Sequence, residues 1–216
     1  MAESTVRTQY DQLAILYDQR WHSYVTRTLS FLHTWARIPA QASVLDVACG
    51  TGEFERQLLA AHPTQSIVGV DISAQMLAIA QQKYATYSNV SFHLGRAAAL
   101  PFADTSFDSI VCANAFHYFD NPADVLQEMK RVLKPEGTMV ILDWCKDYLL
   151  CRLCDLGLQL FDPAHKHCYT QAALHHILVD SGFTLQRATR IRFGLVWGLM
   201  AVTVTRASSK IHKKGA

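Results

Sequence analysis

Short apolar runs alternate with amphipathic stretches along most of the chain. Apolar runs too short for helices occupy residues 43–48, 66–70, 107–113 and 138–144, and residues 90–94 alternate between apolar and polar side chains. Runs of this length, bounded by turn residues, are typical of strands. Stretches with apolar positions at helical spacing separate them. Because this β-α alternation favours parallel pairing, the pattern predicts an α/β fold with helices on both faces of the sheet.

The pattern changes after the fifth predicted strand. Residues 147–161 and 170–181 have the spacing of two helices, separated by an irregular loop. The segments from Phe183 to Arg190 and from Leu195 to Thr205 then predict two strands joined by a tight connection. A hairpin of this kind adds an antiparallel strand to an otherwise parallel sheet.

Residues 8–36 precede the first strand and form an addition to the sheet. Their aromatic and apolar positions predict two helices, and Pro39 ends the region. We expect these helices to act as a lid or to pack against the sheet. The whole pattern predicts one domain over residues 1–206, with a helical cap at 8–36, a helical insertion toward the acceptor site at 145–181 and a basic, flexible tail at 207–216.

A glycine turn after the first predicted strand is the clearest candidate for a binding site. Gly50 and Gly52 follow the buried run, and helix-forming residues begin at Glu53. A strand-turn-helix unit aims backbone N–H groups and the positive helix end at the turn. Small residues there let a ligand approach the backbone closely. The turn is therefore expected to bind a carboxylate or a phosphate.

Asp71 ends the second predicted strand, nineteen residues after Gly52. Open α/β sheets bind ligands beyond the carboxyl ends of their strands, so this carboxylate is placed to accept hydrogen bonds from both hydroxyls of a ribose. A dinucleotide site would have a third glycine where Glu55 stands, and Glu53 would lie beside its pyrophosphate. The pattern therefore disfavours NAD.

Composition and charge narrow the class of protein. Half of the 216 residues are hydrophobic, and the net charge of +2 is too small to indicate a nucleic-acid partner. No secretory signal is evident, and the longest apolar run, residues 193–204, is too short to span a bilayer as a helix. Six cysteines then indicate reduced thiols. We expect a cytoplasmic protein without membrane insertion; the sequence carries no signal for its oligomeric state.

Four short motifs occur in order: Leu-Asp-Val-Ala-Cys-Gly-Thr-Gly at 45–52, Val-Asp-Ile-Ser at 70–73, Ala-Leu-Pro-Phe at 99–102 followed by Phe-Asp at 107–108, and Leu-Lys-Pro-Glu-Gly at 133–137. Each alone is weak. Together they resemble the class I S-adenosylmethionine-dependent methyltransferases, in the group that includes the ubiquinone/menaquinone C-methyltransferases (methyltransferase type 11). The resemblance implies S-adenosyl-L-methionine as the cofactor. It also implies a Rossmann-like seven-stranded sheet, mostly parallel with an antiparallel C-terminal hairpin strand.

The resemblance further implies which residues hold the cofactor. The glycine turn would contact the methionine part, the aspartate after the second strand would hold the ribose, and apolar residues would flank the adenine. A tyrosine of the N-terminal helices would cover the cofactor. By position these residues are Asp46, Ala48, Gly50, Gly52 and Asn114 at the methionine part, Asp71 at the ribose, Ile72, Met76 and Ala97 at the adenine, and Tyr17 as the cover.

Two residues depart from the pattern of the family. Many relatives have an aspartate that bonds the adenine amine where this chain has Arg96, which cannot accept that bond. Losing one hydrogen bond of about 0.5–1.5 kcal/mol weakens affinity by roughly tenfold at most. Many relatives also have glycine where this chain has Ala48. A methyl group is tolerable there if the residue keeps ordinary backbone dihedrals.

Methyl transfer is an in-line displacement, so the protein has to align the reactants and exclude water. Three residues near the expected acceptor side are catalytic candidates: His117, Asp143 and Tyr169. His117 is a candidate base or a packed loop histidine. Asp143 ends a central strand, where ligands bind. Tyr169 is placed to donate to a substrate oxygen or to lie at the start of the next helix, near Thr170.

Cysteines and histidines gather after the fifth strand, at Cys145, Cys151, Cys154, His165, His167 and Cys168, together with Asp162. Zinc sites usually show paired short spacings, and only one occurs here, so we expect no metal. Cysteines buried on an apolar face with Leu150, Leu153 and Leu158 are the simpler expectation.

The sequence as a whole predicts a methyltransferase that acts on a small, apolar or aromatic acceptor. Two alternatives stay open: a non-catalytic protein that binds S-adenosylmethionine in a regulatory role, and a thiol or metalloid methyltransferase similar to those that act on arsenite.

Overall fold

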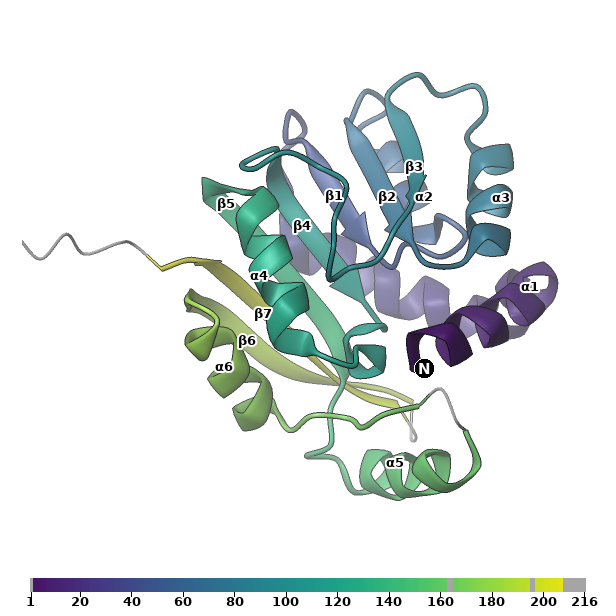
Figure 1. The fold of residues 1–216 in the computed structure, drawn as a ribbon, viewed down its shortest axis with the longest axis vertical. Coiled ribbons are helices and arrows are strands. Elements are labelled where there is room, and N and C mark those ends of the chain that lie inside the picture. The colour runs from purple at the N-terminus through teal and green to yellow at the C-terminus, as the bar shows by residue number, and fades with distance from the viewer. Residues whose placement is uncertain (1, 163–164, 195–196, 208–216) are drawn as a thin grey trace, which may run out of the picture.

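The computed structural model describes residues 2–162, 165–194 and 197–207 (Figure 1). Seven strands form one sheet in the order β3-β2-β1-β4-β5-β7-β6, in which β7 alone runs antiparallel to its neighbours. This confirms the predicted mostly parallel sheet with an antiparallel C-terminal hairpin strand. The strands are β1 (Val44–Val47), β2 (Ile67–Asp71), β3 (Val90–Leu94), β4 (Phe107–Ala113), β5 (Leu133–Trp144), β6 (Phe183–Phe193) and β7 (Trp197–Arg206).

Helices cover both faces of the sheet because the central strands carry apolar side chains on both sides. In β1, Leu45 and Val47 join a core cluster with α4 and α6, whereas Val44 joins the opposite cluster with α1 and α2. The helices are α1 (Ala2–Ala36), α2 (Glu53–Ala61), α3 (Ala74–Lys83), the short 3₁₀ helix η1 (Phe116–Tyr118), α4 (Pro122–Val132), α5 (Leu149–Phe161) and α6 (Gln171–Asp180).

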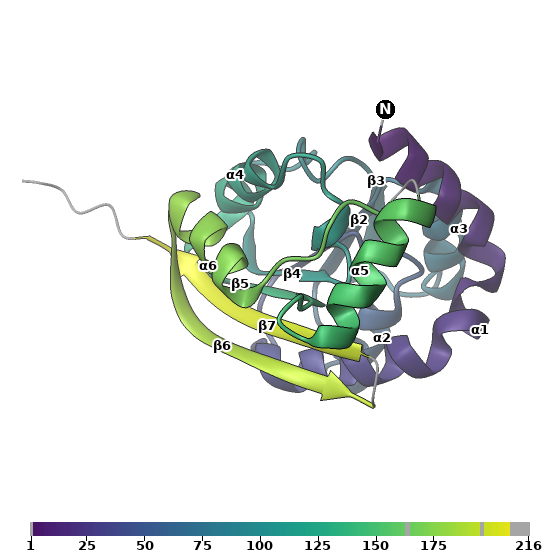
Figure 2. The same ribbon diagram turned by 90° about the horizontal axis from the view of Figure 1, so that it is seen from below.

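The N-terminal region is one helix of 35 residues, so the predicted division into two helices is wrong. Figures 1 and 2 show α1 curving around one side of the sheet. The two aromatic faces expected from the sequence lie on this one helix, and its contacts pass from α3 to α2. The helix ends at Ala36, after which Arg37 has a positive φ of 52°.

The strand β5 is longer than the predicted strand at 138–144, since it begins at Leu133 and includes the segment 134–137. The register between β4 and β5 shifts at this segment. Phe107 pairs with Leu133, whereas the next paired residue of β4, Ser109, pairs with Thr138. Lys134 from this bulged segment contacts both oxygens of the Asp108 carboxylate, at 2.9 and 2.8 Å.

Among the described residues, no helix has the length and apolar character that a membrane span requires. The predicted basic tail lies outside the described residues except for Ala207, and so does Leu195 of the predicted hairpin.

Candidate functional site

A cavity of about 100 Å³ lies where the parallel strands end, beneath the first half of α1. The turn after β1, the end of β2 and the segments after β3 and β4 form its floor. Eight of the ten residues predicted to hold the cofactor line it: Tyr17, Ala48, Gly50, Asp71, Ile72, Met76, Ala97 and Asn114.

The two glycines of the turn have different roles. Gly50 has a φ of +57°, and a Cβ built on it would meet nothing within 4 Å, so its backbone borders open space in the cavity. Gly52 does not line the cavity. It has a φ of +82° as the N-cap of α2, and a Cβ there would lie 2.7 Å from the Tyr84 ring. Gly50 is therefore available to a ligand, while Gly52 serves helix capping and packing.

Ala48 has a φ of +62°, which is not the ordinary conformation that the sequence analysis required for a tolerable methyl group. A left-handed conformation costs an alanine roughly 1–2 kcal/mol relative to the right-handed region. The turn keeps this strain because the backbone N–H groups of Ala48 and Cys49 both donate to the Val70 carbonyl, at 2.8 and 3.2 Å. The glycine found in many relatives avoids this strain.

The Asp71 carboxylate lies at the cavity wall and also fixes the glycine turn. Its Oδ2 accepts the Gly50 N–H at 2.8 Å, and its Oδ1 accepts the Ser73 N–H at 2.9 Å. Burial raises the pKa of Asp71, and these two N–H groups oppose the shift. Each oxygen keeps a second lone pair, so the carboxylate retains the capacity to accept ribose hydroxyls.

Two further buried acids lie behind the turn. Asp46 does not line the cavity, and no described group donates a hydrogen bond to its carboxylate. Glu55 of α2 is 0% exposed, and both its carboxylate oxygens lack a hydrogen-bond partner among the described residues. Burial raises the pKa of Glu55 to about 8, and burial with the charges of Glu55 and Asp71 raises the pKa of Asp46. Both carboxyl groups therefore favour the protonated, uncharged form.

Glu55 makes stability depend on pH. Its pKa rises from 4.5 to about 8 on folding, so the folded state holds a proton that the unfolded state releases. The free energy of unfolding should therefore fall by about 1.4 kcal/mol per pH unit between the two pKa values. Glu55→Gln should remove this slope. Urea unfolding at pH 5 and pH 8 checks it: the advantage of the variant should grow with pH, and parallel curves for the two proteins would refute the assignment.

The helix α1 closes the cavity from above. Small-molecule sites usually enclose about 300–1,000 Å³, more than this cavity holds with α1 in place. The polar contacts that hold α1 include Glu3 with Arg96 at 2.6 Å, Asp11 with Ser73 at 2.6 Å, and Asp18 with Lys83 at 2.6 Å.

The contact of Arg96 accounts for its departure from the family pattern. Its guanidinium pairs with Glu3 of α1, and the arginine is not part of the cavity lining. Both side chains are partly exposed, so the pair adds little stability. The arginine thus contacts the helix that closes the cavity.

Ten other residues line the cavity without having been predicted to bind the cofactor, among them Glu3, Val6, Tyr10, Tyr118 and Phe119. Tyr10 lies two helical turns before Tyr17 on the same face of α1, and its ring meets the Tyr118 ring edge-on at 5.6 Å. The sequence contained the aromatic face of the helix, but it did not show that the segment after β4 meets that face.

His117 and Asp143, two of the three predicted catalytic residues, form a buried pair. His117 Nδ1 lies 2.6 Å from Asp143 Oδ1, and the backbone N–H groups of His117 and Trp144 donate to the same carboxylate at 2.8 and 2.7 Å. A carboxylate that accepts three donors places the histidine proton on Nδ1. Nε2 then keeps its lone pair, and no described group donates to it. The arrangement is that of a general base held by an acid.

The pair lies behind the cavity wall and is not part of its lining. The His117 ring is 4.1 Å from the ring of Tyr118, which does line the cavity, and it stacks on Trp144 at 5.3 Å. Trp144 Nε1 donates to the Tyr24 hydroxyl, which donates to Asn114 Oδ1, both at 2.7 Å. Asn114 in the cavity is thereby connected to the aromatic cluster around the base.

Tyr169, the third predicted catalytic residue, is buried away from the cavity. It is 6% exposed, and its ring packs against Phe116 at 5.6 Å and His167 at 4.6 Å. Burial raises its pKa to about 12, with a further contribution from Asp143. Thr170 is the residue that caps α6, since its side chain accepts the Ala173 N–H.

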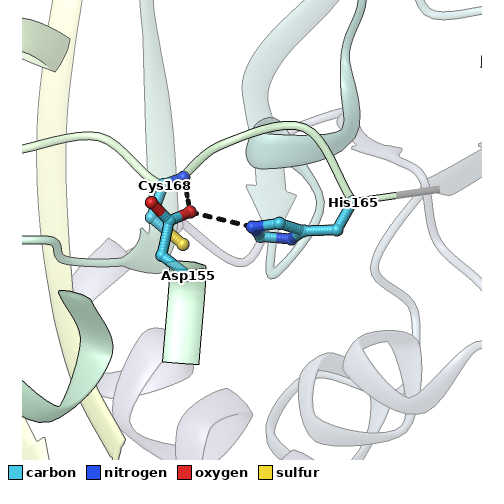
Figure 3. Close-up of side chains that lie close together, drawn as sticks. All are labelled: Asp155, His165 and Cys168. Atoms are coloured by element: carbon cyan, nitrogen blue, oxygen red, sulfur yellow. Dashed lines mark hydrogen bonds and ion pairs between the residues drawn. The ribbon is translucent and has the colours of Figure 1, made fainter. Parts of the chain in front are cut away.

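The thiols do not gather into one site. Among the described residues, the one group of three possible metal ligands within 4.8 Å is Asp155, His165 and Cys168 (Figure 3). Burial raises the Cys168 pKa, which keeps the thiol protonated. The Asp155 carboxylate already accepts the His165 ring and the Cys168 N–H on one oxygen and Lys146 on the other. This group is therefore better described as an anchored buried carboxylate than as an open set of ligands.

S-Adenosylmethionine fits the residues around the cavity. Its methionine carboxylate suits the open backbone over Gly50, and its ribose suits Asp71. Its positively charged sulfonium suits a cavity lined by tyrosine rings. The donors and acceptors of the cavity therefore match the parts of this cofactor.

Comparisons with known proteins agree with this fit. A family model described as "Methyltransferase domain" matches residues 45–141. A demethylmenaquinone methyltransferase of Bacillus licheniformis is 36% identical over 136 residues, which are 62% of this chain and 57% of that protein. A ubiquinone/menaquinone biosynthesis C-methyltransferase, UbiE of Geotalea daltonii, is 34% identical over 152 residues, 64% of this chain and 63% of that protein.

The chain thus spans about three fifths of the length of these curated relatives. A solved SAM-dependent methyltransferase from Aquifex aeolicus has the same fold, with a TM-score of 0.66 at 22% identity over 83% of this chain and 89% of that chain. Family model, relatives and fold therefore agree: over residues 45–141 the chain is similar to the methyltransferase domain family, and its fold is that of a solved SAM-dependent methyltransferase.

Proposed function

We propose that the protein transfers a methyl group from S-adenosylmethionine to an apolar aromatic acceptor of the demethylmenaquinone type, the compound for which relatives are named. The observation that carries this proposal is the open backbone over Gly50 beside the Asp71 carboxylate, in a cavity walled by tyrosine rings. When bound, the cofactor supplies a methyl group activated by its sulfonium. The protein then has to orient the acceptor and exclude water.

Aromatic side chains support an aromatic acceptor. Tyr10, Tyr17, Tyr118 and Phe119 line the cavity. Trp144 lies next to this wall, stacked on His117. Such rings hold flat apolar molecules by offset and edge-on contacts. A positively charged methyl donor also gains from neighbouring ring faces.

The His117–Asp143 pair gives the acceptor a base. A hydroquinone ring carbon is a good nucleophile once a hydroxyl of the ring loses its proton. Nε2 of His117 takes that proton once the acceptor reaches past the Tyr118 ring, which separates the pair from the cavity. Asp143 meanwhile holds Nδ1–H and stabilises the imidazolium that forms. The new C–C bond then forms as the bond between methyl and sulfur breaks, and the ring carbon afterwards releases its own proton.

Calorimetry followed by a transfer assay tests the proposal. Both S-adenosylmethionine and S-adenosylhomocysteine should bind, and methyl-labelled cofactor should label demethylmenaquinone that has been reduced chemically to its hydroquinone before the assay. If neither nucleoside binds, the cofactor assignment fails. If both bind and neither demethylmenaquinone nor a lipid extract of cells gains label, the protein is a binding protein and the proposed activity fails.

A further inference from the structure

The apolar side of α5 faces away from the protein. Leu149, Leu153, Leu156 and Leu160 are spaced at intervals of four, three and four residues, which aligns them along one side of the helix. Their exposed fractions run from 56% for Leu156 to 79% for Leu160, and Phe161 at the end of the helix is 85% exposed. We call these five side chains the leucine face. Monomeric proteins seldom leave a contiguous apolar face of this kind uncovered.

The prediction that Leu150 and Leu153 pack with buried cysteines is wrong. Leu150 is 42% exposed and Leu153 is 57% exposed. The side of α5 that faces the protein carries Cys151 and Asp155, which are the helix's two buried residues. The helix is thus turned with its one acidic side chain inward.

The contacts of Asp155 fix this rotation (Figure 3). Its carboxylate is 0% exposed and meets Lys146 Nζ at 2.6 Å, His165 Nε2 at 2.8 Å and the Cys168 N–H at 2.7 Å. Although burial acts to raise it, the hydrogen bonds from Lys146, Cys168 and His165 lower the pKa of Asp155 to about 2. Turning the leucines inward would take a charged carboxylate away from all these partners, so their exposure is built into the fold.

The leucine face lies at the functional end of the molecule. Figure 2, seen from below, shows α5 beside α1 at the end where the parallel strands finish. Gln9 of α1 donates to Asp162, the residue after α5, at 3.3 Å. Anything that covers α5 therefore also lies close to the helix that closes the cofactor cavity.

Positive charge borders the leucine face. Arg152 is an exposed residue of α5, and Arg192 of β6 lies over the ring of Tyr148, just before the helix, at 5.1 Å. Neither arginine has a carboxylate partner among the described residues. A second copy of the chain docked through the same face would bring these cations together. An anionic lipid surface would neutralise them and accept the leucines at once.

We propose that α5 docks the protein on an anionic lipid surface. The leucine face enters the boundary between headgroups and acyl chains, and Arg152 and Arg192 meet the lipid phosphates. The helix lies along the surface and does not span the bilayer, in keeping with its 13 residues. This docking is independent of the proposed methyl transfer, since it needs neither the cofactor nor an acceptor.

Co-sedimentation with vesicles tests the docking without cofactor. The protein should bind vesicles of phosphatidylglycerol and phosphatidylcholine, and bind pure phosphatidylcholine at least tenfold more weakly. The variant Leu153→Ser/Leu160→Ser should bind the mixed vesicles about 100-fold more weakly, because each leucine that leaves water contributes roughly tenfold. Arg152→Glu/Arg192→Glu should lose the preference for anionic lipid.

The matched control is Leu94→Ser/Val179→Ser, which removes side chains 62% and 51% exposed on β3 and α6. It should bind vesicles like the unchanged protein, and circular dichroism and melting should show that all variants fold. Absence of vesicle binding by the unchanged protein, or an equal loss in the control, would overturn the proposal. A dimer in analytical ultracentrifugation that only Leu153→Ser/Leu160→Ser dissociates, without vesicle binding, would assign the face to self-association instead.

Discussion

Asp71→Ala should weaken the binding of S-adenosylmethionine by about 100- to 10,000-fold. The Asp71 carboxylate lies at the cavity wall at the end of β2, where it is placed to accept two hydrogen bonds from a ribose. Hydrogen bonds to charged groups contribute about 1.5–3 kcal/mol each, and two of them account for the expected factor. Isothermal titration calorimetry with S-adenosylmethionine and S-adenosylhomocysteine measures it.

The alanine also removes the acceptor of the Gly50 and Ser73 N–H groups, so a second variant is needed. Asp71→Asn keeps one oxygen and the shape of the side chain, and it should retain the melting temperature better while still losing affinity. Asp124→Ala, an exposed acid in the first turn of α4, is the control and should bind normally. Unchanged affinity in both Asp71 variants would remove this residue from the cofactor site.

His117→Ala should lower kcat by about 100- to 10,000-fold and leave the affinity for S-adenosylmethionine within about threefold. This is the range that a positioned general base contributes. Asp143 holds Nδ1–H of His117, so Asp143→Asn should also lower kcat, because an amide can stabilise the wrong tautomer. Transfer of labelled methyl to demethylmenaquinone measures kcat, and calorimetry measures the affinity.

His117 is 3% exposed, and an alanine there leaves a cavity, so His117→Gln keeps the volume as a second test. The split between kcat and cofactor affinity separates a base from a packing residue. A comparison of the two variants does the same: a base predicts that kcat falls in both His117→Ala and His117→Gln while the affinity for S-adenosylmethionine stays within about threefold. A normal kcat in His117→Gln would mean that the reaction uses no base at this position.

Local features of the site follow directly from the sequence. An apolar run, a glycine turn and a helix adjacent in sequence are also adjacent in space, so the turn and its open backbone at Gly50 could be predicted. Asp71 could be placed as well, because parallel strands end at one edge of the sheet. The structure places both at the same cavity.

Residues that depend on distant neighbours could not be predicted in this way. Gly52 looks like Gly50 in the sequence, and only the ring of Tyr84 shows that its role is packing. The partner of Arg96 is Glu3, on a helix that crosses over the cavity. Glu55 stands where a dinucleotide fold has glycine, but only the buried environment shows that its side chain lacks a partner.

By itself the sequence determined the class of the fold and the place of the glycine turn and Asp71 at one edge of the sheet, because these depend on spacing along the chain. Only the tertiary structure decided which way α5 faces. Periodicity defines two sides of a helix but not which side meets the protein, and here the buried Asp155 with Lys146 and His165 holds the polar side inward. The leucines face outward because a buried carboxylate cannot leave its partners without a large cost in free energy.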